Sequence, residues 1–264
     1  MLDIFQYAFM QRAFIVGILL AVIIPLIGVI VVLKRLSMIG DALSHTSLAG
    51  VALGLILGIN PIVGAVITCI VAAFSIEAIR RKLPKYAEIS ISIIMSVGIG
   101  GASVLSGFIE DTSGFNSFLF GSIVAITNTE VWMVVVVTAI VVITFLLLYK
   151  ELMFITFDEP GAVLAGLPVK KINFVITLLT AITVSVAARS VGALIVSSLM
   201  VIPVACAMQL ANSYKKTVIY SVLFALLFTI VGLFLSYYFD LKPGGTIVLT
   251  GVVVLIPLMI AKNN

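Results

Sequence analysis

The chain has 264 residues, of which 62% are hydrophobic and only 10% are charged, and its mean hydropathy is +1.35. Soluble domains carry about 25% charged residues, so this composition excludes a soluble protein and a large soluble catalytic domain. The net charge of +4 does not indicate nucleic-acid binding, because the basic residues lie between apolar runs. These runs are continuous rather than alternating, which argues against a β-barrel.

A membrane-spanning helix takes about 20 apolar residues, so the chain predicts an all-α, polytopic transmembrane bundle of eight or nine spans. A single transmembrane domain is expected over residues 1–264. The segment 115–126 is too short to cross and predicts a re-entrant or interfacial helix, and residues 1–11 predict a short interfacial helix. The nine expected spans cover residues 13–33, 37–58, 61–79, 89–108, 130–149, 172–188, 191–211, 217–239 and 245–261.

The distribution of lysine and arginine predicts the orientation, because these residues are concentrated in cytoplasmic loops. With nine spans, three of the 15 basic residues fall on one side, namely Arg12, Arg189 and Lys242. The other side is therefore expected to be cytoplasmic, with the N-terminus outside and the C-terminus inside. The basic residues on the cytoplasmic side are Lys34, Arg35, Arg80, Arg81, Lys82, Lys85, Lys150, Lys170, Lys171, Lys215, Lys216 and Lys262.

The second span holds the most informative polar residues. Asp41 and His45 lie four residues apart, so on a helix they share one face, and Ser44 lies beside them. A charged residue inside a span is costly and indicates a functional site. Carboxylate and imidazole groups bind first-row metal ions, so the pair predicts a metal site. The alternatives are another ion, a proton, or a structural role in which Asp41 bonds to His45 or pairs with Lys34 or Arg35.

Glycines recur every four residues along the same span, at Gly50, Gly54 and Gly58. Small residues at this spacing let two membrane helices approach closely. Gly50 lies about half a turn around the helix from Asp41. We expect the glycine ridge to pack against the bundle while the Asp41 face lines a cavity.

Other polar residues are candidates for the pathway or its gate. Ser197 and Ser198 precede a proline that frees a backbone carbonyl, and Ser198 is the candidate pathway residue. Hydroxyls in spans usually bond to their own backbone. Arg189, near the outer end of its span, is interpreted as an interfacial anchor or as a gate. The acidic outer loop of Glu110 and Asp111 is a second candidate gate.

The longest polar segment on the cytoplasmic side covers residues 150–171. Asp158 and Glu159, followed by a proline, indicate a helix start, and Gly166 with a nearby proline indicates its end. The segment therefore predicts a short helix parallel to the membrane, with an ordinary loop as the alternative.

The chain lacks the sequence motifs of an ATPase or a hydrolase. It has no G-x-x-x-x-G-K-[ST] phosphate-binding loop, and a single His cannot form H-E-x-x-H. Asp41, Ser44 and His45 lie on one helix, where a nucleophile, base and orienting group would not form a relay. We expect no enzyme and no permanently bound cofactor.

Three segments together resemble the permeases of zinc and manganese ABC importers. They are G-D-A-L-S-H-T-S-L-A-G from Gly40, D-E-P-G-A-V-L-A-G-L-P-V from Asp158, and A-A-R-S-V-G-A-L-I-V-S-S-L-M-V-I-P ending at Pro203. The segments occur in the order found in that family. The resemblance covers residues 12–262.

The resemblance implies a permease of an ATP-driven importer in a bacterial cell membrane. Two permease copies, usually identical, would form the pathway, two ATPase subunits would hold ATP beneath them, and an external binding protein would deliver the divalent metal. Asp41 and His45 match the positions expected to bind the metal in transit. Residues 156–168 match the coupling helix that docks on the ATPase, with Asp158, Glu159, Ala162 and Gly166 as its coupling residues.

The resemblance also bears on the metal. Several manganese permeases have a proline after the leucine of H-x-x-L, where this chain has Ala49. The form found here resembles zinc permeases, so zinc is the expected substrate, with manganese or iron as alternatives. Two other hypotheses are a secondary transporter in which Asp41 exchanges a proton or sodium, and an intramembrane enzyme with Asp41 and His45 as an acid–base pair.

Overall fold

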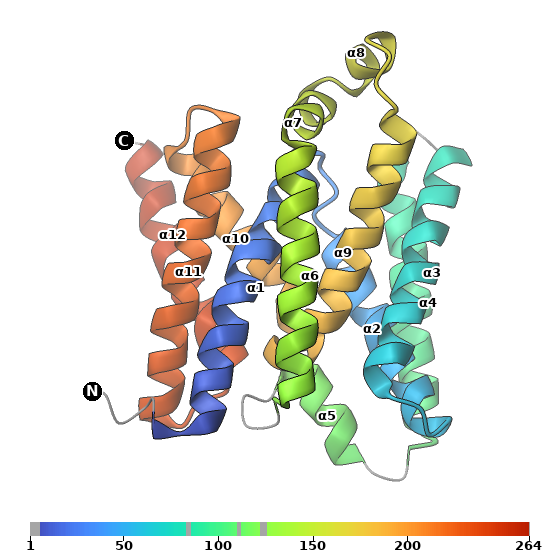
Figure 1. Ribbon diagram of the computed structural model, residues 1–264, viewed down its shortest axis with the longest axis vertical. Coiled ribbons are helices and arrows are strands. Elements are labelled where there is room, and N and C mark those ends of the chain that lie inside the picture. The colour runs from blue at the N-terminus through green and yellow to red at the C-terminus, as the bar shows by residue number, and fades with distance from the viewer. Residues whose placement is uncertain (1–5, 83–85, 110–111, 122–125, 264) are drawn as a thin grey trace.

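The computed structural model describes residues 6–82, 86–109, 112–121 and 126–263, and over these residues the chain folds into helices (Figure 1). In chain order the helices are α1 (Ala8–Leu33), α2 (Ile39–Ile56), α3 (Pro61–Lys82), α4 (Ala87–Ser106), α5 (Thr112–Phe120), α6 (Asn128–Leu147), α7 (Tyr149–Phe157), α8 (Glu159–Leu164), α9 (Val169–Val191), α10 (Ala193–Leu210), α11 (Tyr214–Phe239) and α12 (Pro243–Asn263).

Eight of the described helices are long and apolar enough to cross a membrane, namely α1, α2, α3, α4, α6, α9, α11 and α12. α10 is a shorter apolar helix, and its 18 residues extend about 27 Å at 1.5 Å per residue. This length is close to the hydrocarbon thickness of about 30 Å. The prediction of an all-α bundle with eight or nine spans is therefore confirmed over the described residues.

The short helices lie at the two ends of the bundle. α5 confirms the short helix expected near residues 115–126, and residues 122–125 lie outside the described part of the chain. Residues 1–5 of the interfacial helix expected within residues 1–11 lie outside the described part of the chain, and from Ala8 onward the segment already belongs to α1. α7 was not predicted. It follows α6 directly and leads to α8, which projects beyond the other helices at the end where the C-terminus lies (Figure 1).

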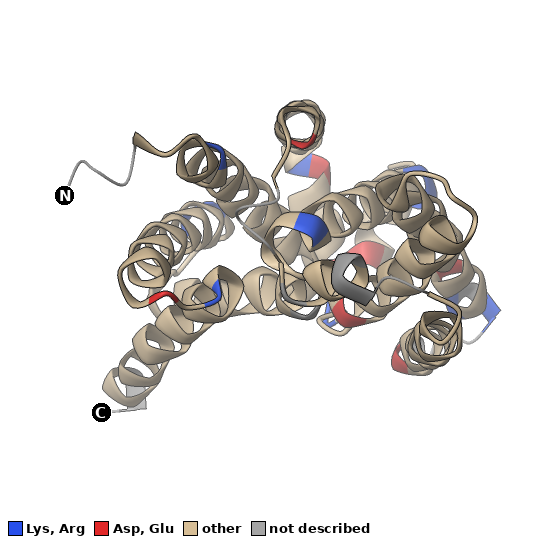
Figure 2. Cartoon of the chain, turned by 90° about the horizontal axis from the view of Figure 1, so that it is seen from below, with Lys and Arg blue, Asp and Glu red and all other residues tan. Residues whose placement is uncertain are grey.

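Charged residues are sparse along the helices, as the view from below shows (Figure 2). The described N-terminal start of α1 and the C-terminus lie at opposite ends of the bundle (Figure 1). The outward faces of α4, α6 and α12 carry exposed apolar side chains such as Val97, Leu147 and Val253. Such faces are typical of surfaces that meet lipid or another membrane subunit.

α2 lies inside the bundle and packs against α3, α4, α9 and α10. Glycine permits its close approach to α3. A Cβ built at Gly50 would lie 2.5 Å from the Gly64 carbonyl oxygen, and one at Gly54 would lie 2.8 Å from Pro61 Cα. The predicted ridge is thus confirmed at Gly50 and Gly54. It does not include Gly58, which has a φ of 65° and lies in the turn after α2.

Candidate metal-transit site

Asp41 lies in the first turn of α2, and His45 follows one turn later. The partial positive charge of a helix N-terminus stabilises a carboxylate there, so Asp41 lies at a favourable end of α2 rather than at its centre. Both residues are partly buried, whereas Ala42, Leu43 and Ser44 between them are buried. The two expected ligands therefore share the partly open face of α2.

The Asp41 carboxylate contacts α10. Ser197 Oγ donates a hydrogen bond to Asp41 Oδ1 at 2.5 Å. The two helices are close here, because a Cβ built at Gly40 would lie 3.1 Å from Ser197 Cβ. The alternative partner Lys34 is engaged elsewhere, at 3.0 Å from Glu159. Lys34, one of the two alternative partners, thus pairs with Glu159, and the bond that Asp41 accepts from Ser197 links α2 to α10.

The two predicted pathway serines are placed differently. Ser44 is only 2% exposed, and its hydroxyl has no hydrogen-bond partner among the described residues. It therefore lies off the open face that Asp41 and His45 share. Ser198 is partly buried, and the serine that contacts Asp41 is its neighbour Ser197.

A metal ion at this site would have few protein ligands from one copy of the chain. Over the part of the chain that the structure describes, no group of three or more His, Cys, Asp or Glu could hold a metal ion. Structural zinc sites take four protein ligands. Asp41 and His45 are two candidate ligands, which is fewer than a structural zinc site uses.

Arg189 links three helices at the end of the bundle where the N-terminus lies. Its Nε is 2.9 Å from Glu130 Oε1, and its guanidinium carbon lies 4.7 Å from the centroid of the Phe118 ring. Glu130 is 8% exposed and also accepts from the Thr127 backbone N–H at 2.8 Å. Arg189 thus pairs with groups of the protein, and its interpretations as an interfacial anchor or as a gate both stay predictions. The other candidate gate, at 110–111, lies outside the described residues.

The expected cytoplasmic helix is present as α8, and both of its ends are capped. At its start, Asp158 Oδ1 accepts from the Gly161 backbone N–H at 2.9 Å. At its end, Gly166 has a φ of 81°, and the Leu167 N–H donates to the Ala162 carbonyl at 3.1 Å. This is the Schellman arrangement that favours glycine. The acidic residue and the glycine thus predicted the two ends of the helix through the caps that the structure shows.

The predicted coupling residues mostly hold α8 in place. Ala162 is fully buried, while Asp158 and Gly166 form the two caps. The large apolar side chains that α8 exposes are Val163 and Leu164, at 58% and 88%. Sequence reasoning missed these two, because a single helical turn of apolar residues does not reveal which face is covered.

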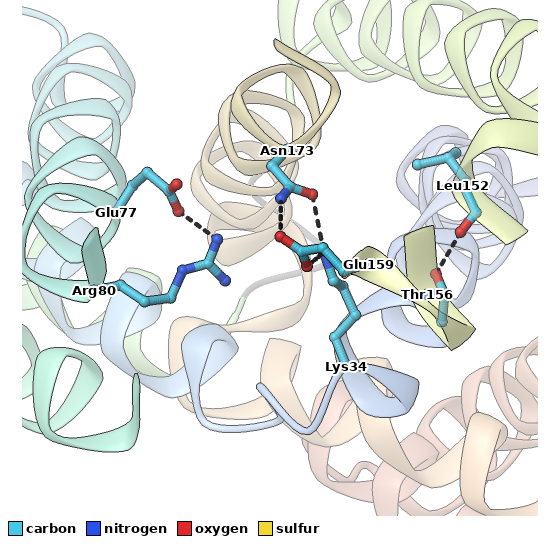
Figure 3. A network of polar contacts seen from close by, with 7 residues as sticks. All are labelled: Lys34, Glu77, Arg80, Leu152, Thr156, Glu159 and Asn173. Atoms are coloured by element: carbon cyan, nitrogen blue, oxygen red, sulfur yellow. Dashed lines mark hydrogen bonds and ion pairs between the residues drawn. The ribbon is translucent and has the colours of Figure 1, made fainter. Parts of the chain in front are cut away.

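Glu159 takes part in a closed ring of three side chains (Figure 3). Lys34 Nζ lies 3.0 Å from Glu159 Oε2 and donates to Asn173 Oδ1 at 2.9 Å, and Asn173 Nδ2 donates to Glu159 Oε1 at 3.1 Å. Burial lowers the pKa of Lys34 from its ordinary value, and the hydrogen bond and charge of Glu159 oppose this shift. The ring ties α8 to the end of α1 and to α9. An ion pair within α3, between Arg80 and Glu77 at 2.6 Å, lies nearby.

The model of the ABC 3 transport family matches residues 6–262 of this chain. The chain belongs to the ABC 3 transport family. The resemblance to the permeases of metal ABC importers is thereby confirmed, and the chain is a multi-pass membrane permease.

Individual relatives in the ABC 3 family cover nearly the whole chain. A "Probable metal transport system membrane protein" of Treponema pallidum is 36% identical over 98% of this chain and 97% of its own length. The "Manganese transport system membrane protein MntC" of Listeria monocytogenes is 32% identical over 94% of this chain and 89% of its own length. A chain in the solved structure of PsaBC from Streptococcus pneumoniae in complex with Fab is 28% identical, with a TM-score of 0.87 over 97% of this chain and 92% of that one.

These relatives do not support zinc as the substrate. The Listeria protein is named for manganese, and so is the "Manganese import system permease protein ScaB" of Streptococcus parasanguinis, which is 31% identical. Manganese, one of the two alternatives to zinc that the sequence left open, is the metal for which these relatives are named.

Several residues of the ABC 3 chain were missed by sequence reasoning. Ser197 was noted only as the neighbour of Ser198, although it bonds to Asp41. Glu130 had a usable signal, because Thr127 and Glu130 form a capping box that predicts the start of α6. No sequence signal indicated the contact between Lys34 and Asn173, because the two residues are 139 positions apart in the chain.

Proposed function

We propose that this chain is the permease of an ATP-driven manganese importer, and that the cation passes Asp41 and His45 on its way to the cytoplasm. The observation that carries the proposal is the partly open face of α2 on which both residues lie. Carboxylates suit Mn²⁺, and imidazole binds several transition metals. The names of the Listeria and Streptococcus relatives support manganese over zinc.

The proposed importer needs other subunits. Two ligands per copy would be completed by a second, identical permease across a shared pathway. ATP would be bound and hydrolysed by two separate ATPase subunits, because this sequence has no phosphate-binding loop. An external binding protein would deliver the metal. The permease would lie in a bacterial cell membrane, with the N-terminus outside and the basic loops and C-terminus in the cytoplasm.

α8 would be the element that docks on the ATPase. It projects from the bundle at the end where the C-terminus lies (Figure 1), and its side chains Val163 and Leu164 are exposed. Asp158, Glu159, Ala162 and Gly166 would act by fixing its position. Closure of the ATPase pair on ATP would then move α8 of both permeases together and switch the pathway from outward-open to inward-open.

We expect Leu164→Asp to weaken binding of the ATPase about 10- to 100-fold. Burying a leucine contributes about 1.5–3 kcal/mol, and each 1.4 kcal/mol is a factor of ten in affinity. The measurement is co-purification and titration of the ATPase with permease in nanodiscs. Leu241→Asp is the matched control, because Leu241 is also exposed, at 52%, but follows α11 at the opposite end of the bundle. Equal ATPase binding by both variants would exclude α8 as the docking element.

The function is tested by metal accumulation in a bacterial strain that lacks its own importers of manganese, zinc and iron. The chain is expressed with the ATPase and binding protein of its host, and the three metals are quantified in the same cells. We expect manganese alone to rise, and the rise to disappear when ATP is depleted. Accumulation of zinc alone would contradict the metal assignment. Accumulation that survives ATP depletion but stops when the proton gradient is dissipated would favour a secondary transporter.

A further inference from the structure

We infer that Ser197 is a positioning residue for manganese transit, which holds the Asp41 carboxylate so that only one of its oxygens is free for the cation. The inference rests on the proposed function. It starts from the hydrogen bond that Ser197 Oγ donates to Asp41 Oδ1 at 2.5 Å.

The direction of this hydrogen bond is unusual for the bundle. Buried hydroxyls in membrane helices mostly donate to the carbonyl four residues back in their own helix. Thr180, Ser185 and Ser221 do so here, at 2.7, 2.6 and 2.6 Å. Ser197 instead donates across to α2, onto the one carboxylate that the α2 site contains. A hydrogen bond to the backbone of its own helix is therefore not what orients the Ser197 hydroxyl.

Tight packing fixes the donor in place. A Cβ built at Gly40 would lie 3.1 Å from Ser197 Cβ and 3.6 Å from Met200 Sδ. On the other side, a Cβ at Gly28 of α1 would overlap the Met200 carbonyl oxygen. α10 is thus held between α1 and α2 over the turn that carries Ser197, and Ser197 itself is 7% exposed. A donor held this way gives the carboxylate a fixed orientation before a metal arrives.

The chemical consequence concerns the geometry of binding. A hydroxyl that donates to Oδ1 leaves Oδ2 as the better acceptor, so Asp41 would bind the cation through one oxygen rather than two. Partners that orient a metal ligand typically change metal affinity 10- to 100-fold when they are removed. Ser197 acts through Asp41 and need not touch the metal.

The test measures Mn²⁺ binding to the assembled permease–ATPase complex in nanodiscs, from the electron paramagnetic resonance signal of free Mn²⁺. Ser197→Ala is expected to raise the Kd about 10- to 100-fold. Ser197→Cys keeps the size of the side chain but is a weaker donor, so its Kd should lie between those of wild type and Ser197→Ala. Ser221→Ala, which removes a buried hydroxyl from α11, is the control and should bind as wild type does.

The outcomes separate the inference from the proposed function. If Asp41→Asn abolishes Mn²⁺ binding but Ser197→Ala leaves it unchanged, the role of Ser197 alone is overturned. Full restoration by Ser197→Cys would overturn it as well, because filling space would then suffice. Wild-type binding that survives in Asp41→Asn would overturn the transit site and with it the inference. Thermal unfolding of each complex checks that the variants are folded.

Discussion

Replacing Asp41 with Asn is expected to lower manganese uptake on the order of 100-fold or more. The substitution removes the negative charge but keeps the shape of the side chain and an oxygen that can accept from Ser197. Loss of a group that merely orients a ligand costs about 10- to 100-fold in metal affinity, so loss of the ligand charge should cost at least as much. The measurement is the initial rate of manganese uptake, normalised to the permease present in the membrane.

Asp240→Asn is the matched control for this prediction. Asp240 ends α11 with a φ of 51°, a left-handed conformation that Asn adopts readily, and it lies far from α2 in the chain. The same change of charge should therefore leave uptake near the wild-type level. Wild-type uptake by Asp41→Asn would remove Asp41 from the pathway and reduce its bond with Ser197 to a structural contact.

Reversing the charge of Lys34 is expected to uncouple ATP hydrolysis from metal uptake. Lys34→Glu would place two carboxylates within the ring that ties α8 to α1 and α9 (Figure 3). Breaking a buried ion pair costs about 3–5 kcal/mol. The Glu159 side chain is 43% exposed, although that of Lys34 is only 11% exposed, so water reduces this cost to about 1–3 kcal/mol. Uptake should fall about 10- to 100-fold, while the ATPase still turns over.

The double variant Lys34→Glu with Glu159→Lys provides the decisive comparison. Asn173 carries both a donor and an acceptor, so its amide can turn and serve the exchanged pair. The double variant should therefore recover much of the uptake lost in Lys34→Glu. Arg80→Gln, which breaks an ion pair within α3 alone, should have little effect. Equal defects in the single and double variants would show that the ring does not connect α8 to the bundle.

The parts of the site that sequence predicts well are those made by neighbours in the chain. Asp41 and His45 share a face because they are four residues apart. The ends of α8 follow from an acidic cap and a glycine with a positive φ. Helical spacing and capping chemistry act over one or two turns, so they can be recognised before the fold is known.

The contacts that position these elements join distant segments, and no local pattern predicts them. Ser197 meets Asp41 across 156 residues, and Lys34 meets Asn173 across 139. Choosing Ser197 over Ser198 would have required the rotation of α10 about its axis, which the close contact with Gly40 sets. The fold class was predictable from composition, whereas these pairings depend on how the helices pack.

The expectation of zinc depended on Ala49, and the structure explains why that position is a poor guide to the metal. Ala49 is 9% exposed. A Cβ built at Gly101 of α4 would lie 3.5 Å from the Cβ of Ala49. The side chain therefore packs against α4, two turns from Asp41. A residue in this place reports how α2 packs against its neighbours rather than which ion passes.

The most direct test of the central claim is metal accumulation by His45→Ala against wild type, in the strain that lacks its own importers. Manganese, zinc and iron are quantified together, and the permease in the membrane is measured in parallel. We predict that His45→Ala loses manganese accumulation while the amount of permease is unchanged. Unchanged accumulation of manganese would contradict the account, because the imidazole of His45 would then not lie on the path of the cation.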